Sequence, residues 1–361
     1  MVTRRRTAAI LAATVLSLVS VAACSDDRSE REPDRAVEDA ILLTAANEQL
    51  SIDPDIDNLR ALLVYVDGEP VLESYYDWPT DAHWDVSAIT NSILATLIGI
   101  AIDEGAIPGL RTTLAELLPE HRADMSRQLA TATLRELLTM TAGFAGLDRD
   151  RTREYMTDPD PVGRILRAAP DPLGGGFEYS NQGAHLLAAI LVRATGTSVL
   201  DYATSRLFGP LGIEVSEAAG FEWPVERSGL HLGWGGLRLT PADLARLGQL
   251  FLDRGEWQGQ QVVPVDWVRA ATQEQVNIRG QTNREQTGDG YGYGWWLTEA
   301  DGETAFFAYG FGGQIIEVVP SRSLVVVVAS EIEYDGPTST GFSAHGLTFL
   351  VDDVIAPAVA P

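Results

Sequence analysis

The chain has 361 residues, of which 51 are acidic and 26 basic, and its formal net charge at pH 7 is −25. All 26 basic residues are arginine, so any mechanism that needs a lysine is excluded, and the acid excess argues against nucleic acid as a partner. Cys24 is the single cysteine and excludes an intramolecular disulfide, while 45% hydrophobic residues are enough for a core that stands alone.

The first 24 residues have the pattern of a secretion signal. Three arginines at positions 4–6 precede an apolar run at 7–21 that is too short for a comfortable membrane span. The run ends in Val21-Ala22-Ala23-Cys24, which resembles the lipobox of bacterial lipoproteins, in which the cysteine is diacylated. We predict a lipoprotein signal peptide at 1–23, lipidation of Cys24, a flexible tether at 24–36, and a protein anchored to the outer face of the cell membrane only through its lipid. An ordinary cleavage site followed by a cysteine without a role is the alternative.

The mature chain begins with the signals of a β-hairpin and a buried helix. Residues 61–66 (ALLVYV) and 71–76 (VLESYY) flank the turn-forming residues 67–70 (DGEP), which predicts the hairpin. A helix is expected from about Ala88 to Glu104, and its centre, ILATLIGIAI, is apolar on nearly every face. Such a helix is expected to lie inside the protein.

The middle of the chain reads as helices and the last part as strands. Amphipathic runs (TLRELLTM, GAHLLAAILVRATG and TPADLARLGQLFLDRG) mark the middle, and β-branched and aromatic runs then recur at 291–298, 304–309, 313–319 and 323–329. Strands at both ends around a helical middle predict an α+β fold, with an antiparallel sheet built from the two terminal segments, flanked by helices. The predicted domain is 37–361, with an α/β part at about 37–112 and 288–361, a largely helical inserted part at about 113–287, and a ligand cleft between them.

Six segments follow one another in a recognisable order: TNSILATLIGIAIDEGAI, TLRELLTMTAGF, FEYSNQGAHLLAAILVRATG, GGLRLTPADLARLGQLFL, YGYGWW and GFGGQIIEVVP. In this order they resemble the serine β-lactamase and penicillin-binding-protein superfamily, on the class C side that includes esterases and nylon-oligomer hydrolases. They extend from about Leu62 to Val328. This resemblance implies a β-lactamase/transpeptidase-like fold and a serine hydrolase ancestry.

The resemblance implies three catalytic elements, and the first is degenerate. Such enzymes carry Ser-x-x-Lys at the start of the buried helix, Tyr-x-Asn in the helical region, and a Lys/His-x-Gly-type triad on a strand. Alignment places Ala88 at the nucleophile position and Asn91 at the lysine position, so both functional side chains are missing. Tyr179-Ser180-Asn181 keeps the second element, and Ala308-Tyr309-Gly310 keeps only the glycine of the third.

Ser87 is the one candidate for a replacement nucleophile. On a helix one residue is about 100°, so the Ser87 hydroxyl is expected to point away from the nucleophile position, and a one-residue shift would put Thr90 in the lysine position. Tyr179 has a phenol with an ordinary pKa near 10, so it needs a neighbouring cation to act as a base at neutral pH. The retained Tyr179 and Asn181 fit either a polar pocket floor or an inherited packed turn.

Other candidates are weak. Residues 341–346 (GFSAHG) miss the last glycine of the Gly-x-Ser-x-Gly elbow, and Trp295 and Trp296 fit sheet packing better than a stacking platform. The histidines have no metal-ligand spacing, and no metal or cofactor is expected; only His231, in a glycine-rich turn, is expected to border the site. The five are His83, His121, His185, His231 and His345.

Two functional hypotheses follow. The first is a pseudoenzyme that binds a small-molecule or peptide ligand, for which a cell-wall peptide ending in D-alanine is a candidate by resemblance. Backbone donors at Ala88 and Phe311 need no particular side chain, so with Tyr179, Asn181, Tyr309 and Gly310 they form the predicted pocket. The second is a weak or rewired hydrolase of esters or amides that uses Ser87 or a bound water.

Overall fold

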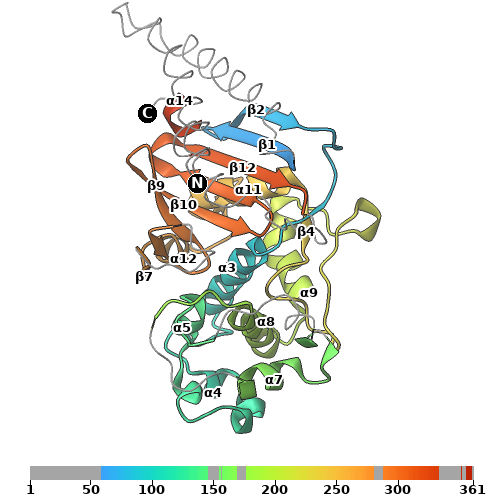
Figure 1. Cartoon of the computed structure of the whole chain (residues 1–361), viewed down its shortest axis with the longest axis vertical. Coiled ribbons are helices and arrows are strands. Elements are labelled where there is room, and N and C mark those ends of the chain that lie inside the picture. The colour runs from blue at the N-terminus through green and yellow to red at the C-terminus, as the bar shows by residue number, and fades with distance from the viewer. Residues whose placement is uncertain are drawn as a thin grey trace, which may run out of the picture.

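A computed structural model describes residues 58–144, 154–155, 157–168, 176–279, 288–332, 351 and 355–359. The predicted signal peptide, Cys24 and the tether lie outside these residues, as do His345 and the segment 341–346. Figure 1 shows the sheet at the top of the molecule and most helices of the middle region below it, with α3 (Ile89–Asp103) running between the two.

An eight-stranded sheet built from both ends of the described chain forms one part of the fold. Every neighbouring pair is antiparallel. The strand order across the sheet is β2 (Glu69–Tyr75), β1 (Leu59–Val66), β12 (Leu324–Ser330), β11 (Gln314–Val319), β10 (Glu303–Gly310), β9 (Trp296–Ala300), β8 (Gly290–Tyr291) and β7 (Val276–Asn277). The expected α+β architecture is therefore confirmed.

Helices cover one face of the sheet and fill the lower part of the molecule. The chain also forms two small two-stranded sheets. They pair β3 (Trp84–Asp85) with β4 (Arg238–Leu239) and β5 (Glu256–Trp257) with β6 (Gln260–Gln261). The other helices are α4 (Leu114–Leu117), α5 (Leu134–Leu138), α7 (Pro161–Ala168), α8 (Asn181–Thr195), α9 (Val199–Ala203), α10 (Gly209–Leu211), α11 (Pro241–Leu252), α12 (Val265–Ala271) and α14 (Ala356–Ala358). Short 3₁₀ helices lie at Pro119–Asp124, Leu129–Thr131, Glu217–Ala219 and Pro320–Arg322, and Thr204–Phe208 is a π-helical turn. Although α11 falls in the segment predicted as the helical part, it packs on β1, β11 and β12.

The sequence run LVVVVAS forms β12 and is buried on both faces. Val325 and Val327 face the core that contains α3, α8 and α11, whereas Val326 and Val328 face the C-terminal residues. Because side chains alternate across a strand, a strand covered on both faces has no polar side to show. This explains why the run is continuous rather than alternating.

The hairpin predicted at 61–76 forms, with Asp67 at φ 53° and Gly68 at φ 80° in its turn. Positive φ at both central residues is the geometry that an Asp-Gly hairpin turn favours. The strand character predicted at 291–298 is divided between two strands of the sheet. Tyr291 pairs with Trp296 across a tight turn in which Gly294 has φ 77°, so this segment is a hairpin made by its glycines.

Helix α3 is buried from Ile89 to Ala101, as its uniform apolarity predicts. Gly99 allows this burial, because a Cβ there would lie 2.2 Å from the indole of Trp267. No single described helix is long and apolar enough to cross a membrane; α8 with the segment Val199–Leu211, bent by 77°, meets that test only as a pair.

The C-terminal residues are held to the sheet by Arg322. Its side chain is 6% exposed and donates from Nη1 to the carbonyls of Ala356 and Val359, at 2.6 Å each, and from Nη2 to Asp301 at 2.5 Å. Figure 1 shows α14 lying against the sheet at the top of the molecule. A buried guanidinium thus donates hydrogen bonds to the carbonyl groups of this terminal turn.

Candidate functional site

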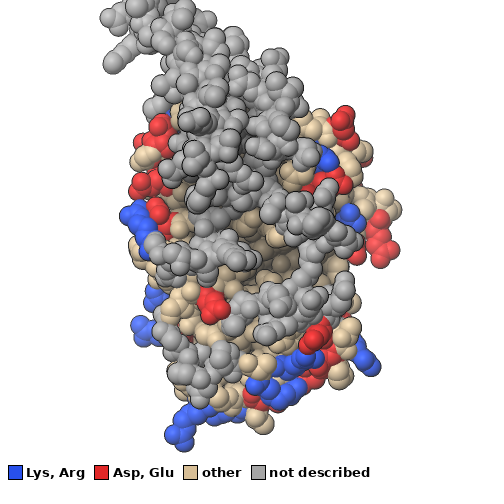
Figure 2. Space-filling model, viewed as in Figure 1, with Lys and Arg blue, Asp and Glu red and all other residues tan. Residues whose placement is uncertain are grey.

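The candidate site lies where the start of α3 meets the end of β10. Gly310 comes so close to the segment before α3 that a Cβ on it would lie 2.3 Å from the carbonyl oxygen of Val86. The loop of Gly235 and Gly236 closes the other side, since a Cβ at Gly235 would lie 3.5 Å from the backbone of Ser87. At the level of α3, Figure 2 shows a recessed, uncharged area between the sheet and the lower helices.

Ser87 lies before the helix rather than on it. Ala88 is the N-cap of α3, and Ser87 has φ 49°, in the left-handed region. Its N–H donates to Asp85 Oδ1 at 2.8 Å, and its carbonyl accepts from Thr90 Oγ1 at 2.7 Å. The 100° helical argument for its direction therefore does not apply. The Ser87 hydroxyl instead accepts a hydrogen bond from the Phe311 N–H at 3.1 Å.

Asn91 is a buried amide, 2% exposed, on the first turn of α3. Its Nδ2 donates to the hydroxyl of Tyr291 at 3.2 Å, and its Oδ1 is buried without a hydrogen-bond partner among the described residues. Burial, with the neighbouring Tyr179, raises the pKa of Tyr291 well above its ordinary value. Tyr291 thus remains a neutral phenol, and the Asn91 amide is also uncharged, so neither group brings a charge to the first turn of α3.

The Tyr-x-Asn element lies at the start of α8. Ser180 is its N-cap and accepts from the Gly183 N–H at 3.3 Å, and Asn181 is the first helical residue. Tyr179 is half-buried and stacks on Trp296 with ring centroids 5.6 Å apart. Trp295 and Trp296 are 2% and 4% exposed, so both indoles pack inside the protein, and Trp296 also carries the ring of Tyr179.

Tyr291 is the site residue that sequence analysis missed, because YGYGWW was interpreted only as sheet. The glycines of this segment were the sequence signal that could have indicated a tertiary contact here. Gly294 approaches α3 closely: its carbonyl accepts from the Ser92 hydroxyl at 2.6 Å, and a Cβ on it would lie 2.8 Å from Ala95. A glycine that lets another backbone approach this closely marks a tertiary contact.

The model of a protein family described as Beta-lactamase matches residues 59–342. The chain belongs to the beta-lactamase family. Over 328 residues, it is 25% identical to the 6-aminohexanoate-dimer hydrolase of Paenarthrobacter ureafaciens, covering 84% of this chain and 81% of that protein. It is 26% identical over 295 residues to penicillin-binding protein 4 of Amycolatopsis lactamdurans, covering 73% and 74%. The fold is also similar to that of a putative 6-aminohexanoate-dimer hydrolase from Bacillus anthracis, with a TM-score of 0.67 at 20% identity, covering 86% and 81%.

Two of the described histidines of this beta-lactamase family member, His185 and His231, lie next to the loop at 233–236. The half-buried His231 packs its ring on Trp223, with centroids 5.7 Å apart, and burial lowers its pKa. His185 is fully buried, accepts from the Gly233 N–H at 3.3 Å and contacts Trp234. Burial lowers the pKa of His185 to about 3, so it is a neutral packing residue that supports this loop.

His185 gives a pH-dependent stability that can be tested. Between about pH 6.5 and 3, the unfolded state binds a proton at this position that the folded state does not, so acid favours unfolding. We expect the free energy of unfolding of the natural chain to fall with decreasing pH more steeply than that of His185→Asn, by up to about 1.4 kcal/mol per pH unit. Urea titrations at pH 4, 5, 6 and 7 measure both slopes, and equal slopes would contradict the assignment.

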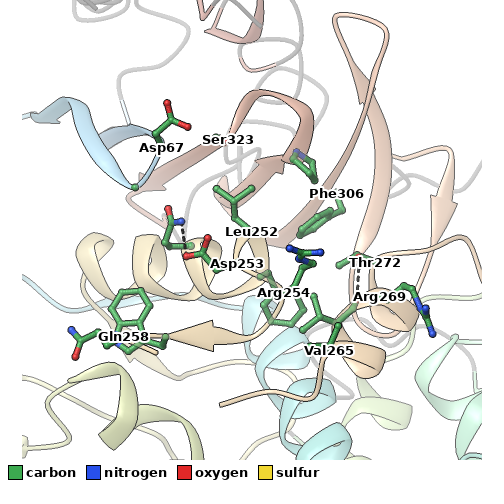
Figure 3. Close-up of a pocket in the computed structure, with 16 residues that line it drawn as sticks. Asp67, Leu252, Asp253, Arg254, Gln258, Val265, Arg269, Thr272, Phe306 and Ser323 are labelled. Carbon is green, nitrogen blue, oxygen red and sulfur yellow. Dashed lines mark hydrogen bonds between the residues drawn. The ribbon is translucent and has the colours of Figure 1, made fainter. Parts of the chain in front are cut away.

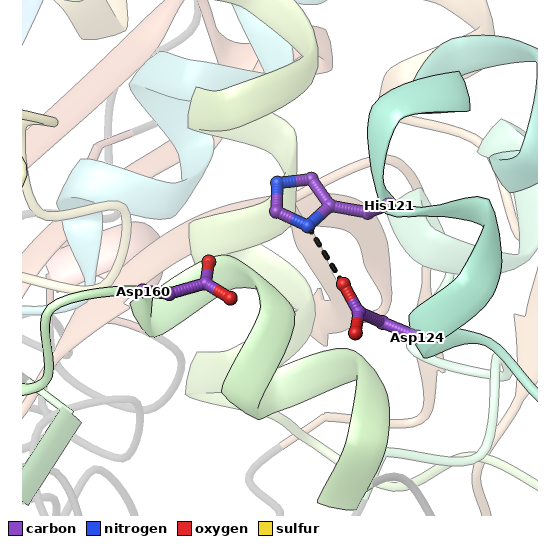
Figure 4. A group of neighbouring side chains, drawn as sticks. All are labelled: His121, Asp124 and Asp160. Carbon is purple, nitrogen blue, oxygen red and sulfur yellow. Dashed lines mark hydrogen bonds and ion pairs between the residues drawn. The ribbon is translucent and has the colours of Figure 1, made fainter.

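His121 belongs to a side-chain cluster far from this site in sequence (Figure 4). Ligand atoms of His121, Asp124 and Asp160 lie within 4.8 Å of one another, and His121 Nδ1 is 3.0 Å from Asp124 Oδ2. Arg167 already bridges the two carboxylates, at 2.7 Å from Asp124 and 3.2 Å from Asp160. We therefore interpret the group as an ion-pair network around a guanidinium rather than a metal centre.

A concavity of about 1000 Å³ lies at the opposite end of the strands (Figure 3). The turns at Asp67 and Ser323 form its rim, Phe306 and Leu252 contribute apolar surface, and Arg254 and Arg269 border it. No residue of the Tyr-x-Asn element or of the start of α3 lines it. We place the candidate functional site at Ser87 and Phe311 instead, because there the family's motif positions converge.

Proposed function

We propose that this beta-lactamase family member is a lipid-anchored binding protein of the cell envelope that lacks covalent catalysis. The observation that carries the proposal is Asn91. The resemblance assigns this position to a lysine that takes the nucleophile's proton, and here it holds a neutral, buried amide bonded to Tyr291. Ala88 supplies no nucleophile, and the lysine-free composition supplies no substitute from elsewhere in the chain.

The pocket retains features suited to a ligand with a carbonyl or carboxylate oxygen. The Phe311 amide faces the start of α3. The Tyr179 ring is fixed against Trp296 and neighbours Tyr291, which bonds Asn91 on the first turn of that helix. A backbone N–H group can donate a hydrogen bond whatever the side chain is, so these donors remain when the catalytic side chains are absent. A cell-wall peptide ending in D-alanine is the ligand that we propose, because the family resemblance points to acyl and carboxylate ligands.

Hydrolysis through Ser87 is the second candidate, and the geometry disfavours it. A nucleophile attacks a carbonyl whose oxygen is held by the oxyanion donors. The Ser87 hydroxyl instead occupies one of those donors itself, since it accepts the Phe311 N–H. The same amide cannot easily hold the attacking hydroxyl and the substrate oxygen together.

Intact mass spectrometry of the mature natural chain tests this proposal. We expect no adduct after incubation with a fluorophosphonate or with benzylpenicillin, whereas N-acetyl-D-alanyl-D-alanine should bind reversibly and shift amide resonances at Phe311. A covalent adduct that maps to Ser87 would instead establish a rewired hydrolase.

The membrane anchor has its own test at Cys24. Expressed in a bacterium that processes lipoproteins, the natural protein should partition into the detergent phase of a two-phase extraction, because two acyl chains anchor a protein stably. Cys24→Ser should move to the aqueous phase, whereas the control Ser25→Ala should behave like the natural protein. Recovery of the natural protein in the aqueous phase, with no lipid mass on Cys24, would contradict the anchor.

A further inference from the structure

The Phe311 amide already has an acceptor inside the protein. Phe311 directly follows β10, at the turn where the Gly313 N–H donates to the Gly310 carbonyl. Its N–H donates to the Ser87 hydroxyl, 3.1 Å away and 224 residues distant in sequence. In the free protein, a serine oxygen therefore lies where a ligand oxygen would accept this hydrogen bond.

The backbone around Ser87 holds the hydroxyl in that place. Left-handed φ is unusual for a residue with a side chain, and here it is enforced from both sides. Asp85 Oδ1 accepts from the Ser87 N–H and also, at 3.2 Å, from the Gly236 N–H, while Thr90 bonds the Ser87 carbonyl. The missing side chain at Gly310 leaves room for the contact, since a Cβ there would lie 3.1 Å from Ser87 Cβ.

We propose that Ser87 is an internal competitor for the ligand: its hydroxyl occupies the Phe311 amide and must be displaced before a carbonyl or carboxylate oxygen can bind. The inference rests on the proposed function, because it takes the same pocket as the ligand site. An N–H group makes one good hydrogen bond, so breaking the internal bond subtracts from the affinity of every ligand that uses this donor. Ser87 thus acts as a positioning residue that sets the affinity of the pocket.

The first test measures reversible binding to the full mature chain. N-acetyl-D-alanine is titrated while the ¹H–¹⁵N resonance of the Phe311 amide is followed, in the natural protein, in Ser87→Ala and in Ser87→Gly. Both substitutions remove the hydroxyl, and glycine also tolerates the left-handed backbone. We expect both variants to have dissociation constants about fivefold lower than that of the natural protein, because one competing hydrogen bond is lost. Ser216→Ala is the matched control, since the Ser216 hydroxyl makes no capping bond, and its affinity should stay unchanged.

The second test uses a covalent readout that does not depend on weak binding. Ser87→Ala is added to a chain that carries Ala88→Ser and Asn91→Lys, and the rate of benzylpenicillin adduct formation is measured by intact mass. We expect the added Ser87→Ala to raise that rate about fivefold, because the oxyanion donor is then open.

The outcomes separate this inference from the proposed function. Tighter binding or, where binding is unchanged, faster labelling on removal of the hydroxyl supports the competitor role. If Ser87→Ala changes neither quantity, or weakens binding, the inference is overturned while the pseudoenzyme proposal stands. An adduct on the natural chain overturns the proposed function whatever Ser87→Ala does.

Discussion

Benzylpenicillin should acylate the Ala88→Ser/Asn91→Lys variant at position 88 and should leave the natural chain unmodified. The two positions lie three residues apart at the start of α3, so their side chains project on neighbouring parts of one helix face. A side chain at position 91 already reaches the Tyr291 hydroxyl, and burial there lowers the pKa of a lysine toward that of a useful base. Removing the nucleophile costs about 10⁶-fold in a serine protease of unrelated fold, so we expect a gain of several orders of magnitude.

The single substitutions identify which part is needed. Ala88→Ser alone supplies a hydroxyl without a base, and Asn91→Lys alone supplies a base without a nucleophile, so each should label far more slowly than the pair. Ala88→Ser/Asn91→Met is the matched control, because methionine has similar length and no amine. Circular dichroism and a urea titration establish that each variant is folded. A folded double variant that forms no adduct would show that the pocket differs from that of its hydrolytic relatives by more than these two side chains.

Arg322→Met should lower the free energy of unfolding by about 3 kcal/mol, because it leaves buried carbonyl groups without their charged donor. The guanidinium is almost fully buried and ties the turn before β12 to both ends of the last described helical turn, at Ala356 and Val359. Methionine fills much of the same volume, so the loss reports mainly the hydrogen bonds. Urea unfolding of the mature chain measures this difference.

Arg193→Met provides the comparison for this change. Arg193 pairs with Glu120 at 3.1 Å, but both side chains are about half exposed, at 51% and 46%. Solvent screens such a pair, so the expected loss is below about 1 kcal/mol. Equal losses for the two variants would mean that burial of Arg322 does not matter, and that the C-terminal residues contribute little to the core.

The fold follows in large part from local patterns in the sequence. The uniformly apolar segment in α3 predicts a buried helix, and the Asp67-Gly68 pair predicts the hairpin turn that forms. Both are encoded within a few neighbouring residues, where periodicity and turn preference act directly. The segment 291–298 shows the limit, because its composition indicated sheet but did not show that its glycines divide it into a hairpin.

The site was determined only partly by the sequence. Motif order placed Ala88 and Asn91 at the positions where the family resemblance implies a serine and a lysine, and the absence of lysine is a fact of composition alone. The direction of the Ser87 hydroxyl and the partner of Asn91 were decided by the tertiary structure. Ser87 bonds Phe311 across 224 residues, and Asn91 bonds Tyr291 across 200. Periodicity and propensity describe neighbours along the chain, whereas these contacts exist only because the sheet brings β8 and β10 against the start of α3.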